Sequence, residues 1–553
     1  MYLRETKRQN GDGSVTRYFQ LAENEWDKQK GCSVTSVIYN FGRADQLDGE
    51  KLKRLASSIL RLFPGEEALA AEPGVKVLDA WPYGGIYVLG RLWHELEIDK
   101  VLGPGSDFER ALFAMTANRA LQPYSKLYCH QQWLKEEVFL PEGQDLGLHQ
   151  LYRAMDHLLL HQEDVEKAVF FKMADLMNAD VDLIFYDTTN LHFEIDEQDE
   201  VGTKGPDGVV RGPLRKRGHA KNKRYDAPLV TVGLAVTREG LPVRSWVFPG
   251  NTVDVSTVAR VKADLKGWKL GRCVVVGDAG MNSEENRRTL ALGLGKYILA
   301  SKMRGGDEVT KQVMTRPGRY APVAGNLRVK EVFVGEGERR TRYVVCHNPL
   351  EQARQEQHRD KLLELLSAEL ATLVPPARGE KHSKRTCELL ASDRFGRYLR
   401  QTKRGVLQID RAAVKRDQHF DGKWVVTSND DSLTPEDLAL GYKQLMRVEE
   451  CWRTMKSGLR MRPVYHWAPH RIEAHIKLCV LGLLLERVAE IRAKDTWRNL
   501  VAKLDAVKVV EYTRGAVRVR QTTELRAEVS SLLKTLGVPP PPRLHTVEEA
   551  PPA

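Results

Sequence analysis

The sequence contains two aspartates whose type and placement could do chemistry. Asp187 closes the apolar run LIFYD and Asp278 closes the run RCVVVGD, so each is predicted to end a buried strand. Because the ends of neighbouring strands can meet at one edge of a sheet, the two carboxylates could together offer the oxygen ligands that hard divalent ions prefer. Either aspartate taken singly could instead close its strand with an ordinary Asx turn, but the pair is harder to explain in that way.

A third carboxylate, Glu449, lies in a segment predicted to be one long helix, TPEDLALGYKQLMRVEECWRTMKSGLRM, with Thr434 as its N-cap and Pro463 as its stop. The stripe that packs on the sheet is formed by apolar residues at steps of three and four: Leu445, Val448, Trp452, Met455 and Leu459. Tyr442, Glu449 and Lys456 are spaced seven residues apart and share a second stripe beside it. At this border Glu449 could reach metals held by the aspartates; a solvated face of Glu and Lys pairs is the alternative.

The elements that must position these residues follow the order of an RNase H-like core. A strand ending at Asp187 precedes a hairpin formed by LVTVGLAV and LPVRSWVF around the turn TREG. The helix VSTVARVKADLKG, the strand ending at Asp278, a helix capped by Ser283 and the strand KYILASK complete the series. The predicted fold class is α/β, with an RNase H-like mixed-sheet catalytic core, an inserted β-containing domain and a mainly helical N-terminal domain.

A chain of 553 residues exceeds what one core usually supports, so several structural units are expected. The N-terminal part has a β-like opening and then helical segments, GRLWHELEIDKVLG and FERALFAMTANRAL, which could bind DNA or simply pack together. The predicted division is an N-terminal accessory and DNA-binding domain over 1–178, the first part of the core over 179–302, an insertion domain over 303–424, the last catalytic helix over 425–495, and a C-terminal segment with a disordered proline-rich tail over 496–553.

The composition favours a polyanionic partner inside the cell. The 85 Lys and Arg residues outnumber the 74 Asp and Glu residues, giving a formal net charge of +11, although a basic composition alone decides little. The N-terminus lacks the apolar stretch of a signal peptide, and the most apolar helical segment, LCVLGLLLERVAEI, is interrupted by charge far short of a membrane span. We therefore expect a cytoplasmic, nucleoid-associated protein without membrane contact. The seven cysteines form no CxxC pair, which indicates reduced thiols rather than zinc ligands or disulfides.

Two basic groups could contact DNA phosphates. The first is the run RGPLRKRGHAKNKRYD, which a solvated loop explains about as well as phosphate contacts; its candidate residues are Arg217, His219, Lys221 and Arg224. The second continues past Glu449 and is better placed for DNA contact; it comprises Arg453, Lys456, Arg460 and Arg462.

The last helix resembles the signature Y-x2-R-x3-E-x6-K of prokaryotic insertion-sequence DDE transposases. Tyr442, Glu449 and Lys456 fit this spacing, whereas Leu445 stands where the arginine belongs. Arg447 lies two residues later, on a different side of the helix, and could substitute for that arginine in contacting DNA.

The resemblance extends from Val181 to His475 and includes the phrases YDTTN, GDAGMNSEEN and VEECWRTMKSGLRMRPVYHW. It implies an RNase H-like core, interrupted by an insertion domain, that acts as a homodimer on double-stranded DNA, namely the terminal inverted repeats of a mobile element and a target. Two Mg²⁺ ions, which Mn²⁺ could replace, would be held by the catalytic carboxylates Asp187, Asp278 and Glu449 and would promote DNA cleavage and strand transfer.

Trp424 approximately resembles an aromatic position that related hairpin-forming transposases use to hold a flipped base, and a buried strand tryptophan is the alternative. Two other functions are open from the sequence. A nuclease of the same fold could hydrolyse DNA without joining ends, because it would need the same three carboxylates. A catalytically inactive descendant could bind DNA as a regulator, although the intact carboxylate set argues against this.

Overall fold

The computed structural model divides the chain into two compact units. It describes residues 2–549 apart from 12–13, 28–31, 48, 50–51, 53, 56–57, 59–74, 177–182, 207, 222, 267, 269–272, 305–308, 324, 338–339, 374–382 and 404. The first unit comprises Met1–Asp79, Val510–Gln521 and Leu544–Ala553, and the second comprises Ala80–Val509 and Thr522–Arg543. The finer domain boundaries expected from the sequence stay predictions.

The first unit is built mainly from two small sheets. One has antiparallel neighbours in the order β1-β2-β3 and consists of β1 (Tyr2–Gln9), β2 (Val15–Asp27) and β3 (Cys32–Arg43). The other has the order β20-β19-β18-β4 and consists of β4 (Val75–Pro82), β18 (Lys508–Arg514), β19 (Val517–Thr522) and β20 (Leu544–Glu549).

The described residues before α3 are therefore mainly strands, and the prediction of a mainly helical N-terminal domain is wrong for this part of the chain. β-branched and aromatic residues, as in VTRYFQ and SVTSVIYNFG, favour strands, and pairing with sequence neighbours satisfies their backbone groups. The proline-rich tail, predicted to be disordered, contains a strand, because Leu544–Glu549 pairs with β19. Residues 550–553 lie outside the described part of the chain.

The second unit contains a group of helices around α15 (Pro469–Ala493), which is buried on nearly all sides. The helices that precede the main sheet are α3 (Gly84–Glu95), α4 (Ile98–Leu102), α5 (Asp107–Leu121), α6 (Lys126–Tyr128), the π-helix η1 (Cys129–Glu137), the 3-10 helix η2 (Pro141–Gly143) and α7 (Leu148–Leu176). After α15 come α16 (Trp497–Leu504) and α17 (Ala527–Leu536). The segments GRLWHELEIDKVLG and FERALFAMTANRAL bury their apolar residues in this core, so they pack the protein together.

The candidate aspartates lie in a nine-stranded mixed sheet with the order β12-β13-β14-β17-β11-β10-β5-β8-β9. Its strands are β5 (Leu183–His192), β8 (Leu229–Val236), β9 (Pro242–Pro249), β10 (Val274–Gly277), β11 (Lys296–Ser301), β12 (Ala321–Pro322), β13 (Arg328–Val334), β14 (Thr341–His347) and β17 (Lys423–Ser428). The chain pairs β5 antiparallel with β8 and β8 antiparallel with β9, while β10 runs parallel to both β5 and β11. This is an RNase H-like core, and the predicted order of three strands, helix, strand, helix and strand is confirmed.

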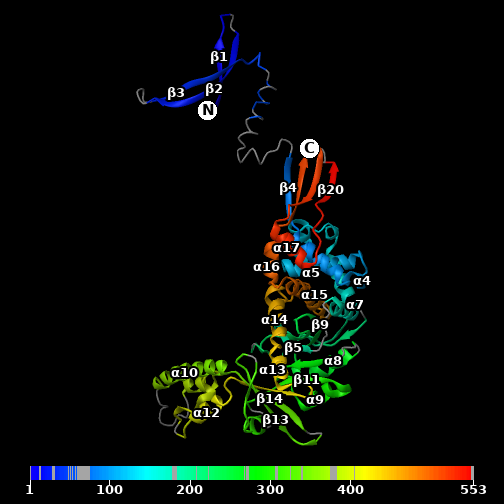
Figure 1. The fold of residues 1–553 in the computed structure, drawn as a ribbon, viewed down its shortest axis with the longest axis vertical. Coiled ribbons are helices and arrows are strands. Elements are labelled where there is room, and N and C mark those ends of the chain that lie inside the picture. Colours follow the sequence, from blue (N-terminus) through cyan, green and yellow to red (C-terminus); the bar gives the residue numbers. More distant parts are fainter. Residues whose placement is uncertain are drawn as a thin grey trace. The chain divides into compact units, whose positions relative to one another are not determined.

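Helices cover both faces of this core (Figure 1). They are α8 (Asp254–Lys266) and α9 (Glu284–Ala291) on one face, and α13 (Pro435–Lys443) and α14 (Met446–Arg453) on the other. Along β5, Ile184 and Tyr186 pack in the cluster formed with α8 and α9, whereas Leu183 and Phe185 pack in the cluster formed with α13 and α14. The strand thus serves the two faces with alternate residues. Ser283 caps α9 as predicted, by accepting a hydrogen bond from Asn286 N.

The segment between β11 and β17 adds strands to the same sheet and builds a small core of its own. β17 pairs antiparallel with both β11 and β14, so β12, β13 and β14 extend the main sheet. The separate cluster contains α10 (Pro349–Ala371), α11 (Lys384–Ala391), α12 (Arg411–Gln418) and the hairpin of β15 (Leu399–Gln401) and β16 (Leu407–Ile409). The remaining short elements are β6 (Thr203–Lys204), β7 (Val210–Arg211), η3 (Leu292–Leu294), η4 (Val309–Val313) and η6 (Gly396–Tyr398).

The single helix predicted to run from Thr434 to Pro463 is interrupted. Thr434 caps α13 as predicted, but around Gln444 the backbone tightens into hydrogen bonds between residues three apart before α14 begins. After α14 the chain widens into the π-helix η7 (Thr454–Gly458). A 3-10 turn and a π turn shift the helical phase in opposite directions, so their effects offset each other. The predicted stripe is therefore buried throughout: Leu445, Val448, Trp452, Met455 and Leu459.

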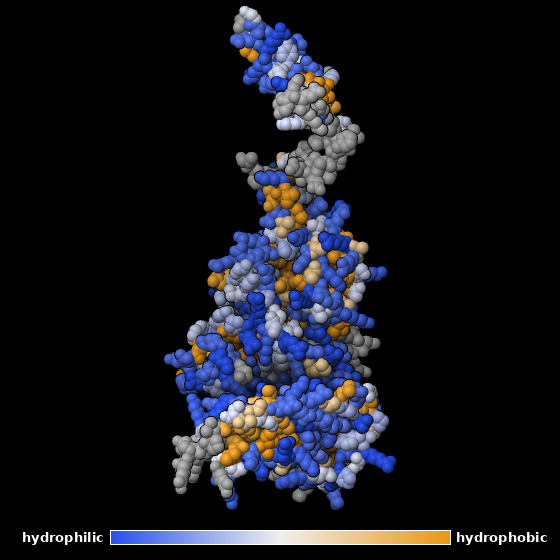
Figure 2. Space-filling view, turned by 90° about the vertical axis from the view of Figure 1, so that its left-hand side faces the viewer, coloured by the Kyte–Doolittle hydropathy of each residue, from blue (hydrophilic) through white to orange (hydrophobic). Residues whose placement is uncertain are grey.

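The face of the molecule shown in Figure 2 is largely hydrophilic, with hydrophobic residues gathered in separate patches. Among the described helices, none is long and apolar enough to cross a membrane.

A buried ion pair between Arg359 and Asp421 joins α10 to the turn before β17. Both side chains are 3% exposed, and the closest nitrogen and oxygen atoms are 2.5 Å apart. Removing one partner would leave the other charge buried and uncompensated. Asp421→Ala is therefore expected to lower the free energy of unfolding by about 3 to 5 kcal/mol, measured by chemical denaturation. As a control, Glu351→Ala removes an exposed pair with Arg354 and should have a much smaller effect; equal losses in the two variants would contradict this account.

Candidate active site

β5 and β10 bring Asp187 and Asp278 to neighbouring positions at an open part of the sheet. β5 is longer than predicted, because it pairs with β8 as far as His192 instead of ending at Asp187. The described pairing of β10 with β5 covers residues 183–185 of β5, and β10 ends one residue before Asp278. Extending that parallel register by two residues places Asp278 beside Asp187, on strands about 4.8 Å apart. The described pairing with β10 thus ends before Asp187, so side chains or a ligand can approach this edge of β5.

The alternation of side chains turns both carboxylates toward the face covered by α13 and α14. Phe185 of β5 and Val276 of β10 pack in the core shared with α13 and α14. Asp187 and Asp278 each lie two residues further along and therefore face the same side of the sheet. This is the side on which α13, α14 and η7 carry the other predicted site residues.

Asp278 also forms the Asx turn that was the structural alternative. Its Oδ1 accepts a hydrogen bond from Gly280 N at 2.9 Å. The turn fixes the orientation of the carboxylate at the end of its strand, so the local role and a role in the site are compatible.

A further carboxylate, Asp254, belongs to the same cluster and was missed in the sequence. It is the first residue of α8, and its Oδ1 accepts a hydrogen bond from Thr188 Oγ1 at 2.5 Å. A Cβ added to Gly280 would lie 3.1 Å from Asp278 Oδ1 and 3.5 Å from Asp254 Oδ2, so both carboxylates approach the same backbone atom. The signal was an aspartate at the start of the helix that follows the hairpin, but acidic residues in a first helical turn are common for structural reasons.

Lys221 supplies positive charge among these aspartates. Its Nζ lies 3.6 Å from Asp187 Oδ1 and 3.5 Å from Asp254 Oδ2, and it donates to the Thr188 carbonyl at 2.5 Å. Its backbone N–H donates to Asn190 Oδ1 at 3.0 Å, which attaches the basic loop to the open edge of β5. Burial raises the pKa of Asp187 to about 6; Lys221 opposes this shift, and the other two aspartates add to it.

Tyr442 links the aspartates to Glu449. It packs on α13 against the main core, and burial together with the charges of Asp278, Glu449 and Asp187 raises its pKa to about 12. All three predicted carboxylates therefore act electrostatically on one phenol. Glu449 itself is exposed on α14, directly after the buried Val448, so it lies at the predicted border between core and solvent.

Lys456 lies beside the same strand. Its ammonium group, carried by η7, donates a hydrogen bond to Thr189 Oγ1. Burial lowers the pKa of Lys456, and the charges of Arg462 and Lys221 act in the same direction, against that of Asp187. A run of positive charge therefore adjoins Asp187 on the side of α14.

The donor set fits a divalent cation. Carboxylate oxygens are the ligands that hard cations prefer, and a cationic group, the Lys221 ammonium, already lies between Asp187 and Asp254. In the part of the chain that the structure describes, no three His, Cys, Asp or Glu side chains are spaced as a ready metal site. Asp187, Asp278 and Glu449 thus share one region without forming a complete ligand shell.

The arginines predicted to contact DNA on and after the last helix are at the surface. The position where the family signature has arginine is instead buried. Leu445 is buried there, so an arginine in its place would have to leave the core. Arg447 is exposed and pairs with Glu450 at 3.0 Å. Arg453 and the two later arginines, at positions 460 and 462, are exposed.

The basic loop is largely neutralised by its own surroundings. Arg224 forms ion pairs with two acidic neighbours, at 2.7 and 2.9 Å. Arg217 donates to two backbone carbonyls, at 2.7 and 3.2 Å. His219 is exposed and stays a prediction as a phosphate contact, whereas Lys221 is the loop residue described above at the carboxylates.

Trp424 lies on β17 opposite Cys346 of β14, and it packs partly buried against the main core. Its indole nitrogen is buried and has no hydrogen-bond partner among the described residues. This is the environment of a strand tryptophan, and its role in holding a base stays a prediction.

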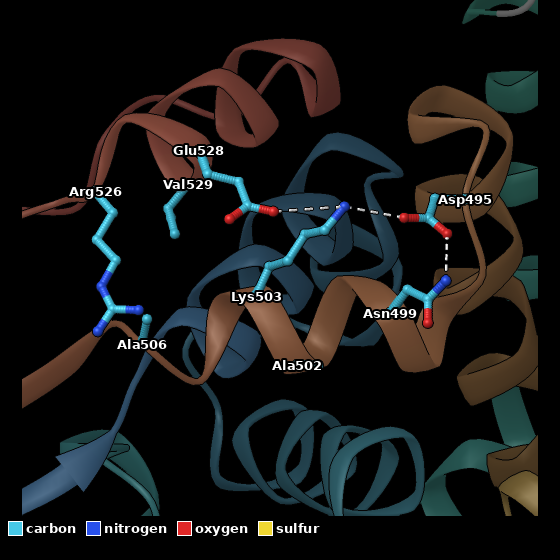
Figure 3. A pocket seen from close by; sticks show the side chains of 8 residues that line it. All are labelled: Asp495, Asn499, Ala502, Lys503, Ala506, Arg526, Glu528 and Val529. Carbon is cyan, nitrogen blue, oxygen red and sulfur yellow. Dashed lines mark hydrogen bonds and ion pairs between the residues drawn. The ribbon is translucent and has the colours of Figure 1, made fainter.

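A separate hollow of about 320 Å³ lies at α16 and α17 (Figure 3). Most of its polar groups are already paired, because Lys503 lies 3.1 Å from Asp495 and 3.9 Å from Glu528, and Asn499 donates to Asp495 at 2.7 Å. The carboxylate cluster on the main sheet is therefore the better candidate for the active site.

Comparisons with known proteins identify the family. The model of the transposase DDE domain matches residues 202–485, which include Asp278 and Glu449, while Asp187 precedes the matched range. The model of the N-terminal domain of IS1634 family transposases matches residues 3–68. A cryo-EM structure of the piggyBac transposase synaptic complex with hairpin DNA is similar at 11% identity and a TM-score of 0.34, covering 72% of this chain and 70% of that chain. The curated proteins contain no match.

The DDE-domain match spans more than half of the chain, and it is joined by the separate match at the N-terminus. The chain therefore belongs to the DDE transposases of the IS1634 family, enzymes that cleave DNA and transfer the cut strand.

Proposed function

We propose that this transposase cuts DNA at the terminal inverted repeats of its own element, and joins the freed ends to target DNA, at a site formed by Asp187, Asp278 and Glu449. The observation that carries the proposal is the alternation along β5 and β10, which turns both aspartates toward the face covered by α13 and α14. The raised pKa of Tyr442 supports it, because all three carboxylates act on that one phenol.

DDE transposases typically depend on divalent metal ions, and the ion proposed here is Mg²⁺, with Mn²⁺ as a substitute. Asp187, Asp278 and Glu449 would hold two such ions, which when bound stabilise the charge on the attacking and leaving oxygens. Lys221 now occupies the space between two of the aspartates, and its side chain is 40% exposed. It is therefore able to swing away from the carboxylates toward a DNA phosphate.

The protein's own residues orient the carboxylates and the DNA strand. Thr188 holds Asp254, and Asp254 shares the Lys221 ammonium with Asp187, so Asp254 acts as a positioning residue. Lys456 is anchored to Thr189 and presents its charge beside Asp187, where a phosphate of the scissile strand would lie. The path of the DNA is proposed to continue over the half-buried Arg224 and over exposed basic residues: Arg447, Arg453, Arg460, Arg462, Arg217 and His219.

The proposed partners are two terminal repeats and a target duplex, held by a homodimer. Joining both ends of an element requires that they be brought together, which a symmetric pair of subunits does with one type of interface. This part of the proposal rests on the family.

Neutralising the carboxylates tests the site. Asp187→Asn and Glu449→Gln are expected to reduce Mg²⁺-dependent cleavage and joining to background, because each removes a metal ligand without changing side-chain size. DNA binding in a gel-shift assay should persist. Glu450→Gln, the next residue on the same helix, is the matched control and should cut normally.

The assay uses a plasmid that carries the element's ends, with and without Mg²⁺. Cleavage that survives in both variants would refute the site. Cuts without joined products would favour a nuclease of the same fold, and binding by the native protein without any cuts would favour a DNA-binding regulator.

Thr188→Val tests the positioning role of the hydrogen bond to Asp254. Valine keeps the shape of threonine but cannot donate to Asp254 Oδ1, so the carboxylate cluster should bind its metal more weakly. We expect a roughly 10- to 100-fold rise in the Mg²⁺ concentration needed for half-maximal cleavage, the range typical of groups that orient metal ligands. Ser256→Ala, in the same turn of α8, is the control. A loss of rate that no Mg²⁺ concentration restores would argue for a purely structural role.

A further inference from the structure

A second hollow, of about 680 Å³, lies between the end of β5 and the segment that follows η7. It is lined by residues 192–195, by Arg215 and Arg224, and by residues 462–467. Its volume falls within the range of about 300 to 1,000 Å³ that is usual for sites binding small ligands. Its lining combines aromatic rings with arginines and has no part in the carboxylate site.

Two aromatic side chains are presented outward at this hollow. Tyr465 is 74% exposed and Trp467 is 67% exposed, whereas Val464, which precedes them, is buried. Both residues line the hollow, so the two rings border the same space. Two exposed aromatic rings that border one hollow form an apolar patch of the kind that marks a binding site.

Trp467 is held in place by an arginine that is itself fixed. The Arg215 guanidinium lies 5.0 Å from the centre of the Trp467 ring, and it forms two hydrogen bonds with Asp199, at 2.9 and 2.6 Å. A cation positioned in this way limits the motion of the indole ring while much of the ring stays exposed. The tryptophan is therefore a preorganised platform and not a freely moving surface residue.

The hollow contains one arginine without an acidic partner among the described residues and one unsatisfied polar atom. Burial and the charges of Arg224 and Arg462 lower the pKa of His192. Arg462 is exposed and forms no ion pair with any described residue, so its charge is available to a ligand. His192 Nε2 is buried and has no hydrogen-bond partner in the described part of the chain.

The backbone of the segment is supported from below. His475 lies 3.0 Å, Nε2 to oxygen, from the carbonyl of Met461, and its other ring nitrogen lies 2.8 Å from Lys126 Nζ. Arg119 donates to the carbonyl of Arg460 at 3.3 Å. Buried groups thus hold the backbone at residues 460 and 461, directly before the segment that lines the hollow.

The hollow adjoins the catalytic strand. His192 follows Asp187 by five residues along β5, which at about 3.3 Å per residue separates them by roughly 17 Å. The charges of both Asp187 and Arg462 act on the pKa of Lys456, so Lys456 lies between the carboxylates and the arginine of the hollow. A DNA strand at the carboxylates would reach it within a few nucleotides.

We propose that this hollow binds an unpaired nucleotide of the DNA strand held at the active site, with its base stacked on Trp467 and Tyr465 and its phosphate paired with Arg462. The inference rests on the proposed DNA-cleaving site. Base stacking on aromatic rings beside cationic groups is the usual way in which proteins hold single-stranded DNA. A fully paired duplex covers both faces of its bases, so an open ring platform selects an unpaired base.

The test compares two DNA hairpins that differ in one feature, a short unpaired extension, in which one base is replaced by 2-aminopurine. The full-length protein is used without divalent ions, so that the DNA is not cut. Native protein should bind the extended hairpin about 10-fold more tightly than the blunt one and should quench the 2-aminopurine fluorescence. Trp467→Ala and Tyr465→Ala should reduce that preference and the quenching, while Trp467→Phe retains most of both.

Trp26→Ala is the matched control, because Trp26 is also 67% exposed but lies on β2. Equal weakening of both hairpins by Trp467→Ala would overturn the proposal, as would quenching that depends on Trp424 and not on Trp467. Quenching that persists in a protein unable to cleave DNA would leave this proposal standing and refute only the active site. Normal cleavage and joining, with quenching unaffected by Trp467→Ala, would refute only the nucleotide pocket.

Discussion

Carboxylates that share one site repel each other, and the structure around β5 depends on how that repulsion is offset. Asp187, Asp254 and Asp278 converge where β10 ends and β5 continues. Burial makes the charged form of Asp187 still less favourable, which its raised pKa reflects. Lys221 offsets this with an ammonium group placed between two of them. The same demand for positive charge is what makes the cluster suited to a divalent cation when DNA is bound.

Successive side chains of β5 point to alternate faces of the sheet and so contact different parts of the site. Tyr186 enters the core under α8 and α9, Asp187 turns toward α13, Thr188 turns back to hold Asp254, and Thr189 meets Lys456. The pairing with β8 must be close for this to work. A Cβ added to Gly233 on β8 would lie 2.6 Å from the Tyr186 hydroxyl, so glycine is required where the buried tyrosine crosses its partner strand.

The two irregular turns on either side of α14 help to position the polar residues that face β5. Tyr442 lies before the tight turn and Lys456 lies in the π-helix, with Glu449 between them. Because the phase shifts of these turns offset each other, the apolar stripe stays buried, and the three polar residues keep to one side of it. The chain then leaves the helix. His475, which also contacts Lys126, holds the carbonyl of Met461 directly before the exposed aromatic segment beside the end of β5.

What the sequence determined by itself is local. Alternation and apolar runs specified the strands of the core and their order, Ser283 and Thr434 specified where two helices begin, and the spacing of Val448 and its partners specified the buried stripe. These features depend on residues a few positions apart, so the pattern alone contains them. The position of Asp187 and Asp278 at strand ends was read in the same way, although β5 extends further than its apolar run.

Tertiary structure decided the rest, because it depends on residues far apart in the chain. Asp254 joins the site only because α8 packs on the sheet where Thr188 can donate to it. Lys221 becomes its counter-charge only because the basic loop lies on the open edge of β5. The strands before α3 and β20 in the tail form by pairing with partners that their own composition does not identify. Periodicity shows which face of an element is buried, but the neighbour that covers that face, and the charges it brings, are set by packing.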